Sequence, residues 1–111
     1  MLAPPEEAAQ NLRSVLIEVL KHLNRDEMEE PDVPGLEEDE LQQILTRRGF
    51  PLITKADTNR AITVLVGNGY ARELTEPRYA WTRSRMVTNR FTITTDGKWF
   101  LSQAVRRENR I

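Results

Sequence analysis

The chain has 111 residues, with 16 lysines and arginines, 17 aspartates and glutamates, one histidine and no cysteine. This length indicates a single domain over residues 1–111, and the lack of cysteine excludes disulfides and thiolate metal sites. The net charge of −1 is unevenly distributed, because residues 1–40 carry 3 basic and 12 acidic side chains whereas residues 41–111 carry 13 basic and 5 acidic ones. A basic segment of this kind favours a polyanionic partner.

Two further classes of protein are disfavoured by the sequence. No apolar run approaches the roughly 18 residues of a membrane-spanning helix, and the first ten residues lack the basic and apolar regions of a secretory signal. We therefore expect a cytoplasmic protein without a membrane partner. Because His22 is the only histidine, we expect no metal, no cofactor and no enzyme activity. A magnesium ion held by carboxylates alone is the alternative that would allow an enzyme.

The N-terminal part of the chain predicts one helix and one loop. Residues 6–24 have apolar side chains at the spacing of a single buried stripe, namely Leu12, Val15, Leu16, Val19, Leu20 and Leu23. Residues 25–35 read RDEMEEPDVPG, and their prolines, glycine and acidic run predict a loop.

Two shorter helices are predicted next. The first covers about residues 37–48, opens with a run of acidic residues that suits the positive end of the helix dipole, and stops at Gly49. The second covers residues 54–68, with Thr54 as N-cap and Asp57 completing a capping box. Gly69 supplies its left-handed stop.

The C-terminal part predicts a hairpin and a last helix. Tyr79 and Trp81, and then Phe91 and Ile93, alternate with smaller or polar residues as in strands, and the polar segment 83–89 joins them as a long tip. Residues 95–108 predict a helix capped by Thr94 or Thr95, and the tail 106–111 is expected to fray.

The resulting order, three helices, a β-hairpin and a C-terminal helix, predicts an α+β fold of the winged helix-turn-helix type. The stretch TNRAITVLVGNGYARE resembles the end of the recognition helix in transcriptional regulators of the MarR and PadR type, with Ile62, Leu65, Gly69 and Tyr70 at the matching positions. The stretch FTITTDGKWFL resembles the closing strand and following helix of the same proteins. The resemblance covers about residues 36–101 and implies DNA binding. The chain lacks the extra dimerisation helices of full-length MarR-type repressors, so a short PadR-type form and a protein adaptor both stay open.

The third predicted helix carries the candidate reading face. Subtracting its buried positions leaves polar side chains near its N-terminus that suit base edges and phosphates in a major groove. These are Lys55, Thr58, Asn59, Arg60 and Thr63. A solvated helix face is the alternative interpretation.

The hairpin carries the second candidate set. Residues 77–95 contain no acidic side chain and four arginines, Arg78, Arg83, Arg85 and Arg90. Arginine is favoured in a narrow minor groove, so these residues would grip the DNA that flanks the site. The alternative is a charged hairpin tip that resists pairing with other strands.

Apolar residues off the main stripes of the terminal helices suggest how the chain self-associates. Ile17 and Trp99 lie off the buried sides of the first and last predicted helices and favour a homodimer through them. Packing of Trp99 against the hairpin is the alternative.

The sequence thus predicts a sequence-specific protein that binds double-stranded DNA, a transcriptional regulator without a cofactor. The alternative is a protein-interaction subunit or adaptor. It would use the acidic segment 26–40, nine acids in fifteen residues with no base, to bind a basic protein partner.

Overall fold

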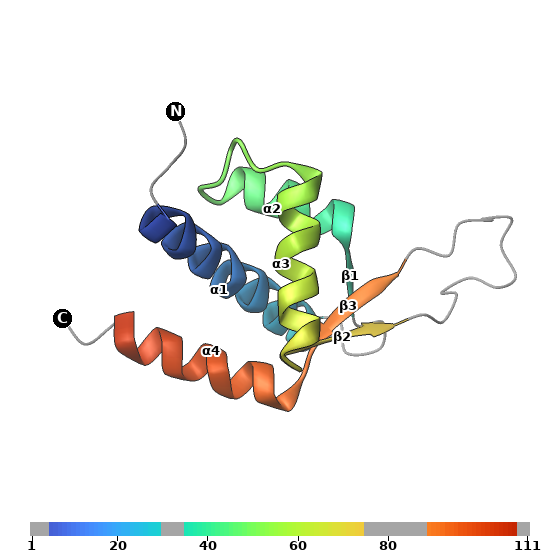
Figure 1. The fold of residues 1–111 in the computed structure, drawn as a ribbon. Coiled ribbons are helices and arrows are strands. Elements are labelled where there is room, and N and C mark those ends of the chain that lie inside the picture. The colour runs from blue at the N-terminus through green and yellow to red at the C-terminus, as the bar shows by residue number, and fades with distance from the viewer. Residues whose placement is uncertain (1–4, 30–34, 75–88, 109–111) are drawn as a thin grey trace, which may run out of the picture.

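A computed structural model describes residues 5–29, 35–74 and 89–108, which form four helices and a three-stranded sheet (Figure 1). The elements in chain order are α1 (Pro5–Glu29), β1 (Leu36–Glu37), α2 (Glu38–Arg47), α3 (Lys55–Gly67), β2 (Ala71–Leu74), β3 (Arg90–Ile93) and α4 (Thr95–Glu108). The predicted α+β class is confirmed, and the described residues contain one strand more than the two of the predicted hairpin.

The sheet is antiparallel, with β3 in its centre between β1 and β2. Leu36 of β1 lies opposite Phe91, and Ala71 of β2 lies opposite Ile93. The sequence predicted β3 but neither of its neighbours, because strands of two and four residues carry almost no periodic signal. The predicted strand around Tyr79 and Trp81 and the tip at 83–89 lie outside the described residues.

The first helix is longer than predicted. α1 continues to Glu29, so the prediction of a loop from residue 25 onward is wrong for 25–29, and residues 30–34 lie outside the described part. Acidic side chains alone do not end a helix, and the first breaker in this segment is Pro31. The Arg25 Nε donates to the Glu29 Oε1 at 2.9 Å, one helical turn on, which supports the last turn.

The two shorter helices begin and end within one residue of their predicted bounds. The backbone N–H of Glu37 donates to the Glu40 carboxylate at 3.1 Å at the start of α2. Gly49 and Gly69, with φ of 111° and 77°, follow α2 and α3 in the left-handed conformation predicted for them.

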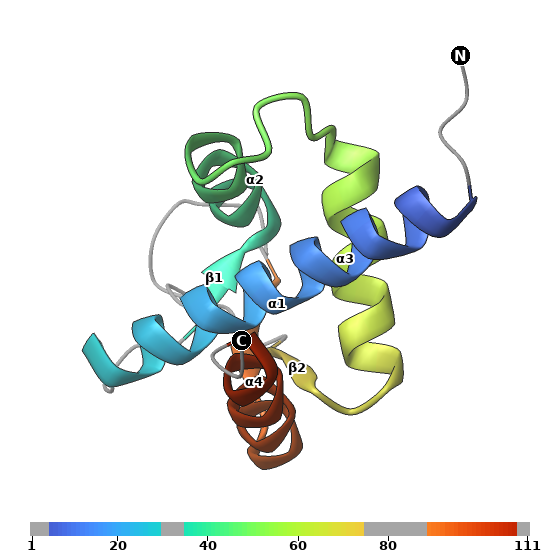
Figure 2. The ribbon, with the colours of Figure 1, turned by 90° about the vertical axis from the view of Figure 1, so that its left-hand side faces the viewer.

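The core is built around α1, which packs against α2, α3, α4 and β3. Figure 2 shows α1 running across the molecule in front of α3. Its buried residues include Ile17, which is only 7% exposed, so the prediction that Ile17 lies off the buried side is wrong. Elements on several flanks of α1 bury a wider arc of the helix than the single stripe that its pattern marks.

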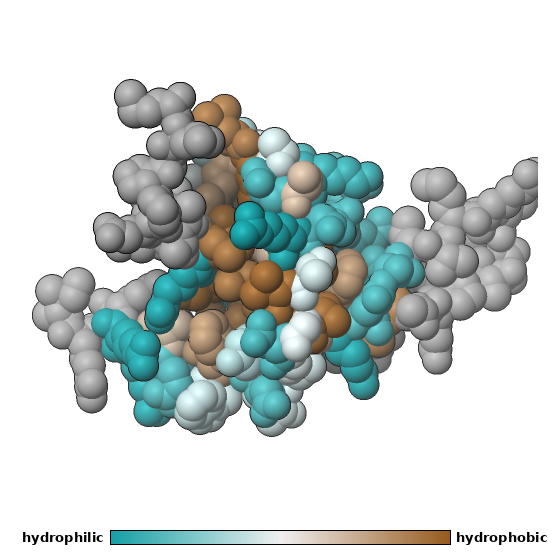
Figure 3. Space-filling view, in the orientation of Figure 1, coloured by the Kyte–Doolittle hydropathy of each residue, from teal (hydrophilic) through white to brown (hydrophobic). Residues whose placement is uncertain are grey.

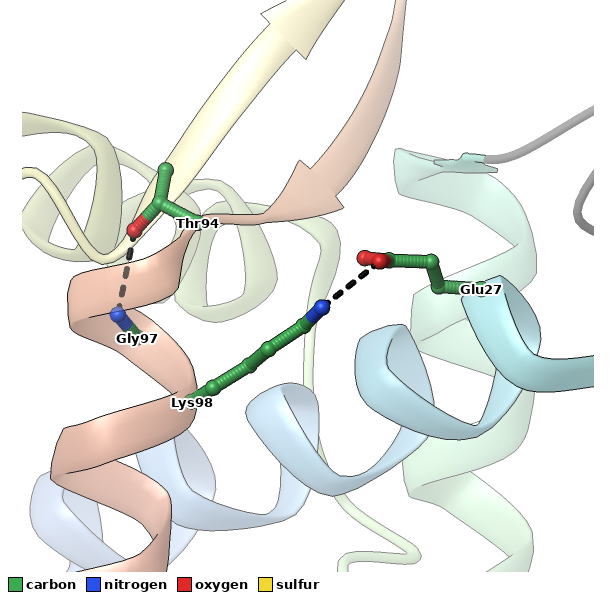
Figure 4. A network of polar contacts seen from close by, with 4 residues as sticks. All are labelled: Glu27, Thr94, Gly97 and Lys98. Carbon is green, nitrogen blue, oxygen red and sulfur yellow. Dashed lines mark hydrogen bonds and ion pairs between the residues drawn. The ribbon is translucent and has the colours of Figure 1, made fainter.

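The last helix is fixed at its first turn to the rest of the fold (Figure 4). The Thr94 hydroxyl accepts from the Gly97 backbone N–H at 3.0 Å and donates to the Gly69 carbonyl at 2.5 Å, which confirms Thr94 as the cap. The Lys98 Nζ contacts the Glu27 carboxylate of α1 at 2.7 Å. The helix ends at Glu108, so residues 106–108 of the predicted frayed tail are helical, while 109–111 lie outside the described residues.

Candidate functional site

The start of α3 is fixed by a reciprocal pair of side-chain caps. The Asp57 backbone N–H donates to the Thr54 hydroxyl at 3.1 Å, and the Thr54 backbone N–H donates to the Asp57 carboxylate at 3.2 Å. This is the capping box expected from the sequence. The Asp57 carboxylate is therefore engaged with the backbone at the helix end rather than directed at a ligand.

One side of α3 packs on the core and the other is free of it. Ala61, Ile62 and Leu65 are buried among the core residues. Four of the five α3 side chains predicted to contact DNA are exposed, namely Lys55, Asn59, Arg60 and Thr63. The exposed side of α3 thus presents one lysine, one arginine, one amide and one hydroxyl to solvent, together with the carboxylate of Asp57 in the capping box.

Thr58 departs from this prediction, because its side chain is fully buried. Its hydroxyl donates to the Thr54 carbonyl at 3.0 Å, one turn back along the helix. Thr58 lies three and four residues before Ala61 and Ile62, which places all three on the same side of α3. That spacing was readable from the sequence, and it makes Thr58 a core residue rather than a contact residue.

Arg90 is the second departure. It was predicted to lie on the exposed hairpin, but it opens the central strand β3 and is 7% exposed. Its Cα is paired with that of Glu37 on one side and that of Leu74 on the other. A Cβ placed on Gly35 would lie 2.9 Å from the Arg90 Cβ, which shows how closely the chain packs there. Arg90 therefore supports the sheet and is not an available contact for DNA.

The other hairpin arginines, Arg78, Arg83 and Arg85, lie outside the described residues, so their role stays a prediction. The described ends of the hairpin are Leu74 and Asn89. The Asn89 side-chain amide donates to the Glu73 carboxylate across the β2–β3 pair. Arg72 of β2 is exposed, and it was not among the predicted contact residues because β2 itself was not predicted.

A pocket of about 290 Å³ lies where the start of α3 meets the sheet and the start of α2. We call it the junction pocket. Four carboxylates line it, and it also receives Lys55 and Asn59 of α3. The complete lining is Glu37, Glu38, Asp39, Lys55, Asn59, Glu73, Asn89 and Phe91. The sequence shows three of these carboxylates side by side at positions 37–39, but the pairing of β1 and β2 with β3 is needed to bring Glu73 to them.

The junction pocket divides the exposed side of α3 into two parts of different charge. Lys55 and Asn59 line the pocket beside the carboxylates, whereas Arg60 and Thr63 do not. A phosphate approaching Lys55 would be repelled by the surrounding carboxylates, which offsets the attraction of the lysine. The part of α3 best suited to a polyanion is therefore the part around Arg60 and Thr63, which we call the outer edge of α3.

The terminal helices present one large exposed aromatic residue. Trp99 of α4 is 66% exposed, so it does not pack against the described part of the sheet. Its neighbour Phe100 instead stacks on Tyr70, with ring centroids 4.7 Å apart. On the face of the molecule shown in Figure 3, apolar residues gather where α1, α3 and α4 meet. Trp99 thus stays available for a contact between molecules, while Ile17 does not.

The described residues contain no group of three or more histidine, aspartate and glutamate side chains arranged to hold a metal ion. None of their helices combines the length and the apolar composition that a membrane span requires. No protein-family model, no curated protein and no solved structure matches the chain.

Proposed function

We propose that the chain is a winged-helix protein that binds double-stranded DNA through α3, and that it acts as a transcriptional regulator. The observation that carries this proposal is the exposed polar side of α3, with Arg60 and Thr63 clear of the carboxylates of the junction pocket. The element order supports it, because a helix pair followed by an antiparallel hairpin is the arrangement that puts a reading helix beside a wing.

The charge distribution supports different proposed roles for the two parts of α3. Arg60 at the outer edge would contact a base or a phosphate in the major groove, where arginine matches guanine. Lys55 and Asn59 would face the DNA backbone at the margin of the site. The nearby carboxylates would weaken the attraction between Lys55 and a DNA phosphate. The arginines at 78, 83 and 85 would provide the contacts of the wing.

A titration of labelled duplex pools by fluorescence anisotropy at several salt concentrations tests the proposal. Binding should weaken steeply as salt rises, because phosphate contacts release counterions. Arg60→Ala should cost about 1–3 kcal/mol on the preferred duplex. Arg107→Ala is the matched control, because it removes an exposed arginine from the last turn of α4, away from α3 (Figure 1). Absence of duplex binding at low salt would contradict the proposal.

A double variant tests how the acidic residues beside α3 affect DNA binding. Glu38→Gln combined with Asp39→Asn removes two carboxylates of the junction pocket. On the DNA proposal this variant binds duplex more tightly than the original chain, because it removes repulsion without removing a contact. Unchanged affinity would mean that DNA does not approach the pocket side of α3.

A second candidate function is favoured by the same pocket. Four carboxylates gathered beside an aromatic side chain, Phe91, suit a basic segment of a partner protein. The chain would then be an adaptor, as the acidic segment 26–40 also allows. Copurification decides between the two: a stoichiometric partner lost on neutralising Glu37, Glu38, Asp39 and Glu40 supports the adaptor, and a partner indifferent to them counts against it.

For the DNA-binding function we further propose a cytoplasmic homodimer that joins through the terminal helices. Trp99 is the described residue that supports this contact, because it is large, apolar and exposed. Light scattering tests it directly. Trp99→Ala should lower the mass from that of a dimer to that of a monomer, and a monomeric original chain would contradict the dimer.

A further inference from the structure

A second pocket of about 290 Å³ lies on another part of the molecule, between the last two turns of α1, β1 and the end of α2. It shares no residue with the junction pocket, and its charge is of the opposite kind. Three arginines and one histidine line it with two carboxylates and two aliphatic side chains. They are His22, Arg25, Asp26, Glu29, Leu36, Ile44, Arg47 and Arg48.

The two carboxylates of this pocket are already engaged. The Asp26 carboxylate accepts from the Gly35 backbone N–H at 2.8 Å, which ties α1 to the start of β1. The Glu29 carboxylate accepts from the Arg25 Nε at 2.9 Å. This hydrogen bond and the charge of Glu29 raise the pKa of Arg25, so Arg25 stays positively charged. Both carboxylates keep their negative charge, but the three arginines of the lining outnumber them, which leaves the pocket with an excess of one positive charge.

The α2 side of the pocket carries two exposed guanidinium groups. Arg47 and Arg48 have no side-chain hydrogen bond or ion pair with any residue of the described ranges 5–29, 35–74 and 89–108. Their neighbour Ile44, one turn earlier on α2, and Leu36 of β1 are half-buried and supply the aliphatic part of the lining. The pocket thus combines two arginines that no described residue pairs with and a small apolar surface.

We propose that this pocket binds a small organic phosphate monoester, with the phosphate held by Arg47 and Arg48 and the organic part against Leu36 and Ile44. The planar guanidinium fork donates two parallel hydrogen bonds to phosphate, and a second fork beside it matches the second negative charge. A volume of about 290 Å³ is at the lower end of ligand pockets, which limits the organic part to about one ring. None of these residues belongs to the exposed side of α3, so the inference does not depend on the proposed function.

Calorimetric titration of the full chain with phenyl phosphate, inorganic phosphate and benzoate tests the site. Phenyl phosphate should bind at about millimolar concentration or below, and more tightly than either inorganic phosphate or benzoate. The difference in affinity between phenyl phosphate and inorganic phosphate measures the contribution of the apolar lining. The difference in affinity between phenyl phosphate and benzoate measures the contribution of the second negative charge. Equal binding of benzoate and phenyl phosphate would overturn the assignment to a phosphate monoester.

Variants show whether the binding occurs at this pocket. Arg47→Ala combined with Arg48→Ala should weaken phenyl phosphate binding about tenfold or more, because it removes both charged donors. Arg107→Ala, an exposed arginine in the last turn of α4, is the matched control and should bind as the original chain does. Arg47 and Arg48 are both exposed, so far-ultraviolet circular dichroism of the double variant should show an intact fold. Undiminished binding by the folded double variant, or no binding by the original chain, would overturn the proposal.

Discussion

α3 and β3 both carry side chains for which the sequence predicts DNA contact, and the fold places them differently. α3 packs on the core along one side only, so Arg60 and Thr63 remain exposed. β3 lies between two other strands and against α1, so Arg90 is buried. The arrangement of the neighbouring elements around each segment, rather than the charge of the residue, decides which side chains can reach a partner. Substitutions around β3 should therefore change stability, and substitutions on the outer edge of α3 should change binding.

The largest effect is expected at Gly97, which lies in the first turn of α4 and packs against Ile93 of β3. A Cβ there would lie 2.0 Å from the Tyr70 carbonyl oxygen, a backbone atom that cannot move aside without distorting the sheet. Gly97→Ala should lower the free energy of unfolding by about 3 kcal/mol or more. Chemical denaturation measures this change.

Gly67 of α3 is the matched control, because a Cβ there meets nothing within 4 Å. Gly67→Ala should raise the free energy of unfolding by up to about 1 kcal/mol through helix propensity. If Gly97→Ala and Gly67→Ala change the free energy of unfolding in the same direction, the tight packing inferred beside β3 is contradicted.

The next effect concerns two arginines on neighbouring strands. Arg90→Ala should lower the free energy of unfolding by about 1–3 kcal/mol, because it removes a buried side chain from the central strand. Arg72→Ala on β2 removes an exposed arginine and should change it by no more than about 0.5 kcal/mol. Equal losses in the free energy of unfolding of the two variants would show that the position of an arginine in the sheet does not determine its contribution to stability.

A smaller effect is expected for two threonines of α3. Thr58 and Thr63 each donate to the carbonyl four residues back, at 3.0 and 2.8 Å, but Thr58 is buried and Thr63 is exposed. Thr58→Ala should cost about 1–2 kcal/mol of stability through the lost methyl group and hydrogen bond. Thr63→Ala should stay within about 0.5 kcal/mol. Thermal unfolding of the two variants compares them, and a larger loss for Thr63→Ala would reverse our assignment.

The smallest effect on stability is expected at the outer edge of α3. Arg60→Ala removes a side chain that is exposed and forms no hydrogen bond or ion pair with other described residues. Its free energy of unfolding should stay within about 0.5 kcal/mol of the original value. A marked loss of stability in denaturant titration would mean that Arg60 is structural, as Arg90 is.

The helices could be predicted from the sequence because their signals are local. The capping pair of Thr54 and Asp57 and the left-handed glycines after α2 and α3 mark helix ends that the structure confirms. The predicted end of α1 lies too early, because the prolines, the glycine and the acidic run of residues 25–35 together predict a loop from residue 25, whereas the first helix-breaking residue is Pro31.

The sheet and the two pockets could not be predicted in the same way. β1 pairs Leu36 with Phe91, which is 55 residues away in the sequence, and no local pattern reports such a pairing. The junction pocket depends on it, since Glu37 and Glu73 meet only when β1 and β2 flank β3. The same long-range pairing places Arg90 in the centre of the sheet, against the prediction from its charged surroundings.

The central claim, that the outer edge of α3 contacts duplex DNA, is tested most directly by nuclear magnetic resonance. An amide correlation spectrum of the labelled chain would be followed as duplex is added at low salt. The account predicts the largest shifts at the amides of Arg60 and Thr63, with little change at Arg107 at the end of α4. Shifts confined to residues outside α3, or no shifts at all, would contradict it.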